Sequence, residues 1–332
     1  MTLGALVTYC WQDASDAPLI HHSRLSPLIA DPAVVAPEQA PDGTWHLFAH
    51  SAWGIHHYRS ADGLSWNDHG IVVRRGMRPW IFSDGGAWRL VYERFRAAAL
   101  ALTALPGRPW WSCIELRSST DLRHWGPART LLEPSLPRHR SAGLGEALGC
   151  PCIVKGDGRY HLYYSAGLVR VPDCGFNEPR CIGLAFADRV EGPYAPAPEP
   201  ILEPDAGNAG ANLSRGAFRV LRLEDGWAGF ENGISFHSGM SASALLLLRS
   251  VDGIRWEPAA SRPVVAPAPG WKRSHVYAGC PVPRVNGELY LYYNARNDWP
   301  LARGRENIGL AIGRPAGKEP AAVARGPVEA SS

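Results

Sequence analysis

Acidic side chains beside or within apolar segments are the residues of this sequence best suited to do chemistry. Asp31 directly precedes a proline in an apolar stretch, and Glu93 ends an otherwise apolar segment. A carboxylate that is buried without a partner costs much free energy, and Arg78 is the expected partner of Glu93. Glu146 lies in a glycine-flanked loop that could swing its carboxyl into a pocket, although an exposed loop acid is the alternative interpretation.

Polar residues recur at one place in the repeated segments of the chain. His50, Glu93, Ser165 and Asn294 each end a similar aromatic-rich run. Four polar residues at one equivalent place predict a polar ring near a pocket, and such a ring could position a ligand.

Cysteine and tryptophan supply the remaining candidates for contact with a ligand. Cys150 and Cys280 each precede a proline, and the sequence leaves open whether they form a nucleophilic or metal-binding pair or are small buried hydrophobic residues. Trp53, Trp80 and Trp299 could stack on a ligand ring or pack between sheets.

A repeated unit must position these residues. The unit is an apolar segment with an X-Pro start, a glycine turn and an aromatic-rich segment. Its copies are 31–35 with 45–50, 78–82 with 88–93, 150–154 with 160–165, and 280–282 with 289–294. Second units of strand, turn and Trp follow at 58–66, 116–125 and 248–256, with weaker relatives at 184–194 and 308–312. X-Pro is tolerated at a strand start, and Asp-Gly or Asn-Gly suits a hairpin turn.

The repeats predict an all-β fold, a single five-bladed β-propeller of mostly four-stranded antiparallel blades. Each Trp of a second unit is expected to pack between neighbouring blades. A six-bladed sialidase is the rival architecture, but only five repeats fit. The single domain spans 1–332, with blades at roughly 25–75, 76–135, 145–205, 212–267 and 273–313, a segment 3–11 that closes the ring, and a flexible tail at 314–332.

Bulk properties narrow the class of protein. A net charge of +3 gives no reason to expect nucleic acid or a membrane surface as partner. The chain lacks an apolar run of about twenty residues, which predicts no transmembrane helix, and its first residues make a poor signal peptide. Seven Cys without CxxC pairs indicate a reduced, cytoplasmic protein. The oligomeric state stays open.

The blade motifs resemble the arabinanase/levansucrase/invertase superfamily, the fold of glycoside hydrolase families 43, 32 and 68, along nearly the whole chain. The resemblance implies an axial pocket in which three acids from different blades act. It makes Asp31, in Ala30-Asp31-Pro32, the base or nucleophile. The other two family acids are not matched, because Arg78 and Gly149 stand near the places where an Asp and a Glu are expected.

The resemblance leaves Glu146 or Glu93 as the acid. It also places His275 roughly where family 43 carries an axial His, so a structural cation at the propeller axis is left open, and no other cofactor or metal is expected. The residues that bind the ligand are then expected to be Arg78, Trp80, His50, Trp53, Cys150, His275, Cys280 and Asn294.

The resulting hypothesis is a glycosidase of carbohydrate metabolism that cleaves the glycosidic bond of a small furanoside or related glycoside. The alternative is a non-hydrolytic propeller that binds a sugar-like small molecule, or that runs different chemistry with Arg, His and Cys in the same pocket. Fold alone does not decide between these, since function depends on the site.

Overall fold

The computed structural model describes residues 1–96 and 109–317, and nearly all regular structure in them is β-strand. Four-stranded antiparallel sheets recur along the chain, as they do in a β-propeller, so the predicted all-β propeller fold is confirmed. Helical structure in the described ranges consists of α1 (Leu3–Val7) and a short 3-10 turn, η2 (Pro137–His139). Neither is long and apolar enough to cross a membrane.

The strand pairings divide the described strands into consecutive antiparallel groups of four. The first three groups are β2 (Ala30–Val35), β3 (Trp45–Ser51), β4 (Gly54–Ser60), β5 (Asn67–Arg74); β6 (Gly76–Asp84), β7 (Ala87–Phe95), β8 (Trp110–Ser119), β9 (Arg129–Leu132); and β12 (Leu148–Gly156), β13 (Arg159–Val171), β14 (Phe176–Ala187), β15 (Ala195–Pro196). The last two are β16 (Ser214–Leu223), β17 (Gly226–His237), β18 (Met240–Ser250), β19 (Glu257–Pro258); and β20 (His275–Pro283), β21 (Leu289–Arg296), β22 (Glu306–Arg314), β1 (Cys10–Asp13).

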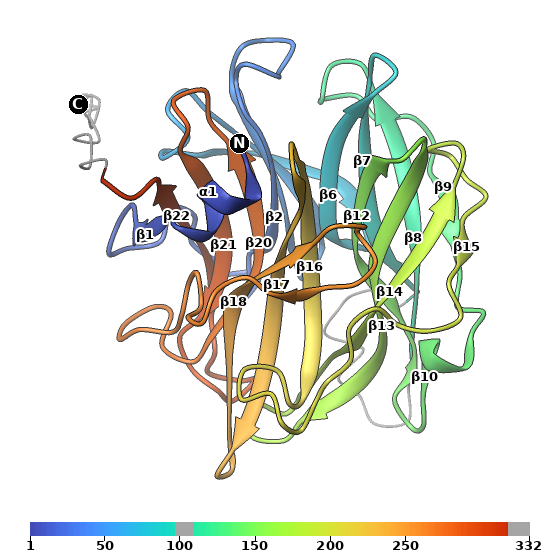
Figure 1. Ribbon diagram of the computed structural model, residues 1–332, viewed down its shortest axis with the longest axis vertical. Coiled ribbons are helices and arrows are strands. Elements are labelled where there is room, and N and C mark those ends of the chain that lie inside the picture. The colour runs from blue at the N-terminus through green and yellow to red at the C-terminus, as the bar shows by residue number, and fades with distance from the viewer. Residues whose placement is uncertain (97–108, 318–332) are drawn as a thin grey trace.

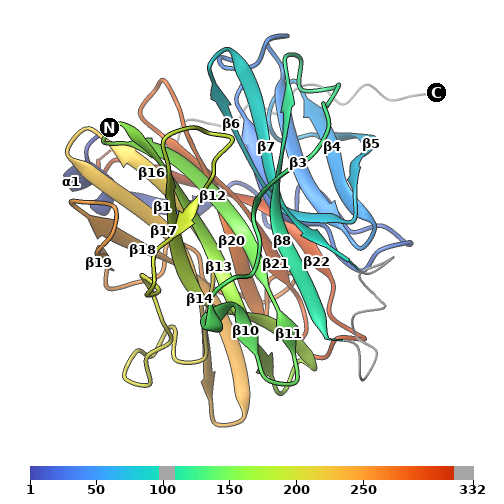
Figure 2. The ribbon, with the colours of Figure 1, turned by 90° about the vertical axis from the view of Figure 1, so that its right-hand side faces the viewer.

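The first strand of each group in chain order (β1 aside) is its innermost strand. β2, β6, β12, β16 and β20 contact one another in that order, and β20 returns to β2, so the innermost strands close a ring. Outside the ring, β10 (Arg140–Ser141) and β11 (Gly145–Glu146) form a small ladder on the first residues of β8, at the lower end of Figure 2.

The N-terminal segment differs from the strand expected over 3–11. Leu3–Val7 forms α1, which buries Leu6 in the core, and the strand that pairs with β22 is β1, Cys10–Asp13 (Figure 1). The apolar character that suggested a strand therefore serves a helix with one buried side chain. Of the predicted tail, residues 318–332 lie outside the described part of the chain, while Arg314 still pairs within β22.

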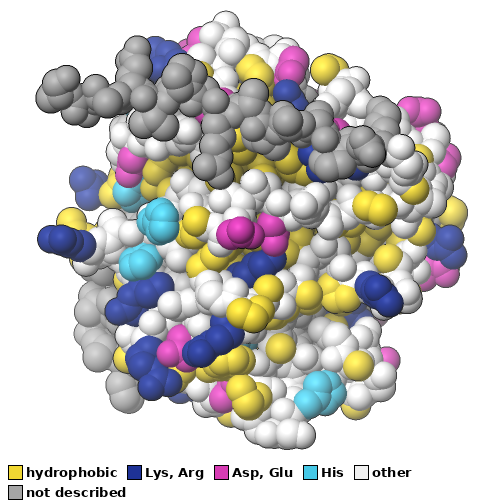
Figure 3. All heavy atoms as spheres, turned by 90° about the vertical axis from the view of Figure 1, so that its left-hand side faces the viewer, with side chains coloured by type: hydrophobic (Ala, Val, Ile, Leu, Met, Phe, Trp, Pro, Cys, Tyr) yellow, Lys and Arg dark blue, Asp and Glu magenta, His cyan; other side chains and the backbone are white. Residues whose placement is uncertain are grey.

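The indole of the second unit packs on an aromatic ring of the preceding group, as expected. Each contact is close to perpendicular, the edge-to-face geometry that aromatic pairs favour. The pairs are Trp66 on Tyr292, Trp125 on Phe48, and Trp256 on Tyr163. On the face shown in Figure 3, acidic, basic and apolar side chains are interspersed, which agrees with the small net charge.

Candidate active site

A β-bulge in each innermost strand positions the candidate side chains. The pairing register shifts between Ala30 and Ala33 in β2, and at the equivalent place in the other four innermost strands. In three of them the bulge begins with Asp31, Arg78 or Cys150, whose φ angles are +52°, +53° and +46°. Non-glycine residues rarely adopt this left-handed backbone, and it is frequent at functional sites.

These X-Pro pairs therefore lie inside the innermost strands rather than at their starts. A bulge leaves a residue out of the ladder, so a proline there loses no hydrogen bond. The equivalent bulge in β20 falls at Tyr277, three residues before Cys280. The expected equivalence of Cys280 with Asp31 and Cys150 is therefore wrong.

Arg78 is the centre of a group of charged side chains. Its Nη1 lies 2.9 Å from Glu93 Oε2, and its Nη2 lies 3.6 Å from Glu178 Oε2. The backbone N–H of Arg78 donates to His50 Nδ1 at 3.3 Å. His50 Nδ1 also lies 3.5 Å from Asp31 Oδ2. Burial lowers the pKa of His50 to about 4, so this imidazole is neutral near pH 7.

A second arginine, Arg296, belongs to the same group of charges, because its charge and that of Glu306 act on Glu178. Arg296 Nη1 lies 3.2 Å from Glu306 Oε1, and Asn294 Nδ2 donates to Glu306 Oε2 at 3.0 Å. The Asn294 side-chain oxygen accepts the backbone N–H of Asp31 at 3.2 Å, which ties β21 to β2. The carboxylate cluster, as named here, consists of Asp31, Glu93, Glu178 and Glu306 around Arg78 and Arg296.

Electrostatics single out one acid of the carboxylate cluster. Burial raises the pKa of Glu178 to about 7; the Arg78 guanidinium opposes this rise, and the charges of Glu306 and Asp31 add to it. Burial also raises the pKa values of Glu93 and Glu306. Solvent still reaches the cluster, because the side chains of Asp31, Arg78, Glu178 and Glu306 are 11 to 16% exposed. The arrangement can therefore present a protonated carboxyl and a second carboxyl to a bound molecule near neutral pH.

The glycine that replaces the expected acid of β12 makes room for Glu93. A Cβ atom on Gly149 would lie 2.0 Å from Glu93 Oε2, far inside contact distance. Glu93 comes from β7 and is opposite Met77, and its side chain is only 1% exposed. The carboxylate of Glu93 thus fills space that a side chain at position 149 would need.

Three expected site residues lie elsewhere. Glu146 pairs with Arg140 on the β10–β11 ladder, with Nε and Oε1 2.8 Å apart, and its described contacts do not reach Asp31. Trp80 is buried in the core, where its indole N–H donates to the carbonyl oxygen of Ile153. Cys280 is buried too, and its sulfur accepts the backbone N–H of Val34. Glu146 was expected because it is the acid nearest to Gly149 along the chain, and Cys280 because of its X-Pro motif, and neither signal specifies where the side chain lies in the fold.

Of the remaining expected residues, Cys150 and His275 lie near charged groups of the carboxylate cluster, and Trp53 lies on the turn that follows His50. Cys150 packs in a small apolar group with two alanines. The charge of Arg78 lowers the pKa of its thiol, although burial raises that pKa by more. His275 is buried, stacks on Tyr277 and lies 3.0 Å from the Ser241 hydroxyl. Trp53 is 48% exposed on the turn between β3 and β4, just after His50 and Ser51.

Sequence reasoning missed Glu178, Glu306, Arg296 and Tyr277. The two glutamates lie at the beginning of the third strands of their groups, β14 and β22, whereas the second units recognised in the sequence begin later in these strands, at 184 and 308. A usable signal was present, because Glu178 precedes a proline and leads into the apolar run from Cys181 to Ala187. The predicted polar ring is also off by one residue in its last member, since Ala295, not Asn294, is equivalent to His50.

The described residues contain no group of three or more His, Cys, Asp or Glu side chains arranged to hold a metal ion. Among the innermost strands, the fully buried Arg219 donates to the carbonyl oxygens of Pro151 and Pro79. These oxygens could otherwise face a cation, and the guanidinium already supplies positive charge beside them. An axial cation does not fit at this position.

No protein-family model and no curated protein sequence matches this chain. Solved structures do match it. An N-acetylgalactosamine deacetylase from F. plautii, solved with blood group B trisaccharide, aligns with a TM-score of 0.63 and 15% identity over 92% of this chain and 94% of that chain. Zg3597, a family 117 glycoside hydrolase of the marine bacterium Zobellia galactanivorans, gives 0.61 and 16% over 93% and 91%. A thermostable family-43 glycoside hydrolase gives 0.59 and 15% over 88% and 95%. The chain therefore has the propeller fold of these enzymes, as its motifs predicted.

Proposed function

We propose that this protein is a glycoside-processing enzyme that cleaves the glycosidic bond of a small furanoside or a related glycoside at the carboxylate cluster. The observation that carries the proposal is the carboxylate cluster, in which burial raises the pKa of Glu178 to about 7 and the charge of Asp31 adds to the rise. Cleavage of a glycoside needs one carboxylic acid to protonate the leaving oxygen and one carboxylate to attack or to activate water. The propeller glycoside hydrolases with the same fold support this assignment.

Asp31 is the base or nucleophile in this proposal, and Glu178 is the general acid. Asn294 fixes the backbone of Asp31, and the neutral His50 lies beside its carboxylate without neutralising it. Arg78 contacts Glu178 with one nitrogen and Glu93 with another. Because Glu93 is almost fully buried behind this guanidinium, it orients Arg78 rather than contacting the substrate.

The rival chemistry through cysteine is disfavoured by the burial of both thiols. Burial raises the pKa of Cys150 to about 12 and that of Cys280 to about 11. The nucleophile of cysteine chemistry is the thiolate, which would be scarce at neutral pH. We therefore assign Cys150 to packing beside Arg78. We also propose that the buried guanidinium of Arg219 serves in place of an axial cation, so that catalysis needs no cofactor.

Trp53 is the side chain best placed to bind a sugar ring. About half of it is exposed, and its indole N–H donates to the carbonyl oxygen of Leu25, which fixes the ring plane. A fixed and exposed aromatic face suits the apolar face of a sugar. Trp53 would therefore contribute to binding and not to bond cleavage.

The proposal is tested with a panel of aryl furanosides and related aryl glycosides. The wild-type protein should release the aryl alcohol from at least one of them, and Asp31→Asn should abolish that release while the fold is retained. Glu146→Gln is the matched control, because this acid pairs with Arg140 outside the cluster, and its turnover should equal that of the wild type. Binding of sugars without turnover on the whole panel would instead favour a binding protein.

A further inference from the structure

A chain of hydrogen bonds connects an aspartate to two buried histidines at the end of the first group away from the carboxylate cluster. Asp42 Oδ1 lies 2.9 Å from His46 Nε2, and His46 Nδ1 lies 2.8 Å from His57 Nε2. His46 pairs with Arg59 across the β3–β4 ladder, four residues along from the His50–Ile55 pair, which is about 13 Å of strand. This chain of hydrogen bonds is therefore separate from the candidate active site.

The direction of these hydrogen bonds follows from the acceptor at their start. An ionised carboxylate only accepts, so the proton between Asp42 and His46 belongs to His46 Nε2. Burial opposes ionisation of Asp42, but hydrogen bonds from His46 and Thr44 hold its pKa well below the usual range. A neutral His46 then accepts at Nδ1, so His57 Nε2 carries the second proton. Burial lowers the pKa of His57 to about 3, and the nearby His46, His69, Arg59 and Arg123 add to this effect.

His57 is therefore left with an unprotonated Nδ1. The His57 side chain is almost fully buried between the His46 ring and the Phe48 ring, yet it lines a hollow of about 380 Å³. The described residues offer no hydrogen-bond partner to this nitrogen. It is an acceptor without a partner on a side chain that lines the hollow.

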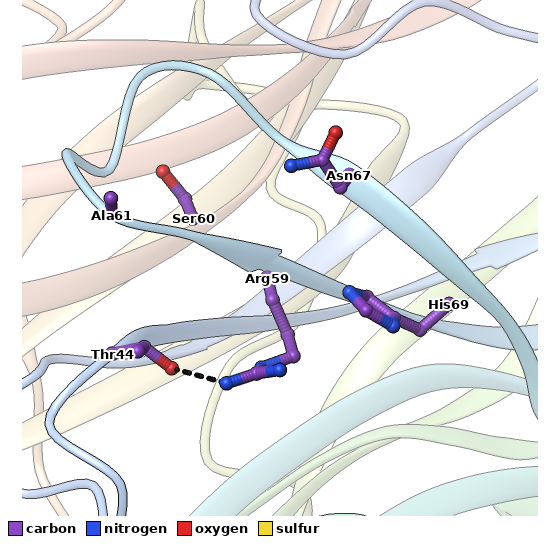
Figure 4. Close-up of a pocket in the computed structure, with 6 residues that line it drawn as sticks. All are labelled: Thr44, Arg59, Ser60, Ala61, Asn67 and His69. Atoms are coloured by element: carbon purple, nitrogen blue, oxygen red, sulfur yellow. Dashed lines mark hydrogen bonds between the residues drawn. The ribbon is translucent and has the colours of Figure 1, made fainter.

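The other polar side chains that line the hollow are cationic or neutral. Arg59 and Arg123 line it together with His69, and a second hollow of about 210 Å³ beside it shares Arg59 and His69 (Figure 4). Both guanidinium groups also contact Asp42 Oδ2, at 2.8 and 2.9 Å. One carboxylate between two guanidinium groups leaves one surplus positive charge, and the buried Nε of Arg59 has no partner among the described residues.

We propose that this hollow binds a phosphate-class oxyanion that still carries a proton. Arg59 and Arg123 would donate to its anionic oxygens, and its P–O–H group would donate to His57 Nδ1. The positive charge of the two arginines would attract any small anion. The unprotonated His57 Nδ1 adds selectivity, because it can form a hydrogen bond only with a ligand that carries a donor. Hydrogen phosphate has both features, and sulfate has the charge without the proton.

The test is calorimetric titration of the full chain with inorganic phosphate and with sodium sulfate at pH 7. Phosphate should bind at least tenfold more tightly than sulfate. Arg123→Gln should weaken phosphate binding at least tenfold, whereas Arg255→Gln, an exposed arginine in the equivalent turn after β18, should leave it unchanged. Absence of phosphate binding, equal binding of the two anions, or equal effects of the two variants would overturn the proposal.

Comparing a phosphomonoester with inorganic phosphate at two pH values shows whether the ligand is free phosphate or a phosphorylated metabolite. Its second pKa is about 6, so it loses its last proton by pH 8, whereas inorganic phosphate keeps one. Glycerol phosphate should therefore bind at pH 5.5 and lose at least tenfold in affinity by pH 8, while inorganic phosphate should still bind at pH 8. Tight binding of both at pH 8 would contradict the role of His57. His57→Phe should reduce phosphate binding to the sulfate level, and Arg123→Gln remains the test if that variant does not fold.

Discussion

Replacing Glu178 with glutamine should change how the stability of the protein depends on pH. Burial raises the pKa of Glu178 from 4.5 to about 7, a shift worth about 3 kcal/mol. The folded state holds this proton more tightly than the unfolded chain does. Glu178 therefore adds to the free energy of unfolding below pH 4.5, and this contribution is lost as the pH rises to about 7. Glutamine cannot ionise, so the free energy of unfolding of the variant does not decrease in this way as the pH rises.

The free energy of unfolding of the variant minus that of the wild type should rise by about 3 kcal/mol between pH 4.5 and pH 8. Urea unfolding followed by tryptophan fluorescence measures it at each pH, and the other titrating groups largely cancel in the difference. For Glu146→Gln, which breaks a partly exposed ion pair, the change should stay within about 1 kcal/mol. A difference for Glu178→Gln that is constant over this range would show that Glu178 does not titrate near neutrality.

Three further variants test other parts of the account. Gly149→Ala should displace the Glu93 carboxylate and reduce turnover at least tenfold, and a crystal structure of the variant would show an unmoved Glu93 if the packing argument is wrong. Trp53→Ala should raise KM on aryl glycosides with kcat nearly unchanged; a fall in kcat alone would assign the indole another role. Arg219→Met leaves two buried carbonyl oxygens without a donor and should lower the free energy of unfolding by about 2–6 kcal/mol, whereas Arg255→Met, at an exposed side chain, should leave it unchanged.

The fold could be predicted from the sequence because its signals are local and repeated. A glycine turn between an apolar and an aromatic-rich run specifies a hairpin within about twenty residues. In the second unit at 58–66, the turn forms where Asp62 accepts the backbone N–H groups of Leu64 and Ser65, and Trp66 then packs on Tyr292. The signals recur in several repeats, so the architecture could be recognised although some copies are weaker.

The site could be predicted only in part because it depends on register. Asp31, Arg78 and Glu93 were found since each interrupts an apolar run on the first or second strand of a group. The bulge of β20 falls at Tyr277, whereas the X-Pro motif of this strand comes three residues later, so the motif placed Cys280 where Tyr277 is the equivalent of Asp31. Glu178 comes from the third strand of the third group and meets Arg78 of the second group only once the two neighbouring groups pack side by side, a contact that the sequence around Glu178 does not specify.

The central claim is that Glu178 donates a proton to the leaving oxygen, and leaving-group dependence tests it most directly. We predict that Glu178→Gln lowers kcat/KM at least about 100-fold on aryl glycosides with poor leaving groups and has little effect on dinitrophenyl glycosides, which need little protonation. Asp31→Asn should lower kcat/KM on every substrate. An equal loss on good and poor leaving groups, or full activity of Glu178→Gln on the poor ones, would contradict the account.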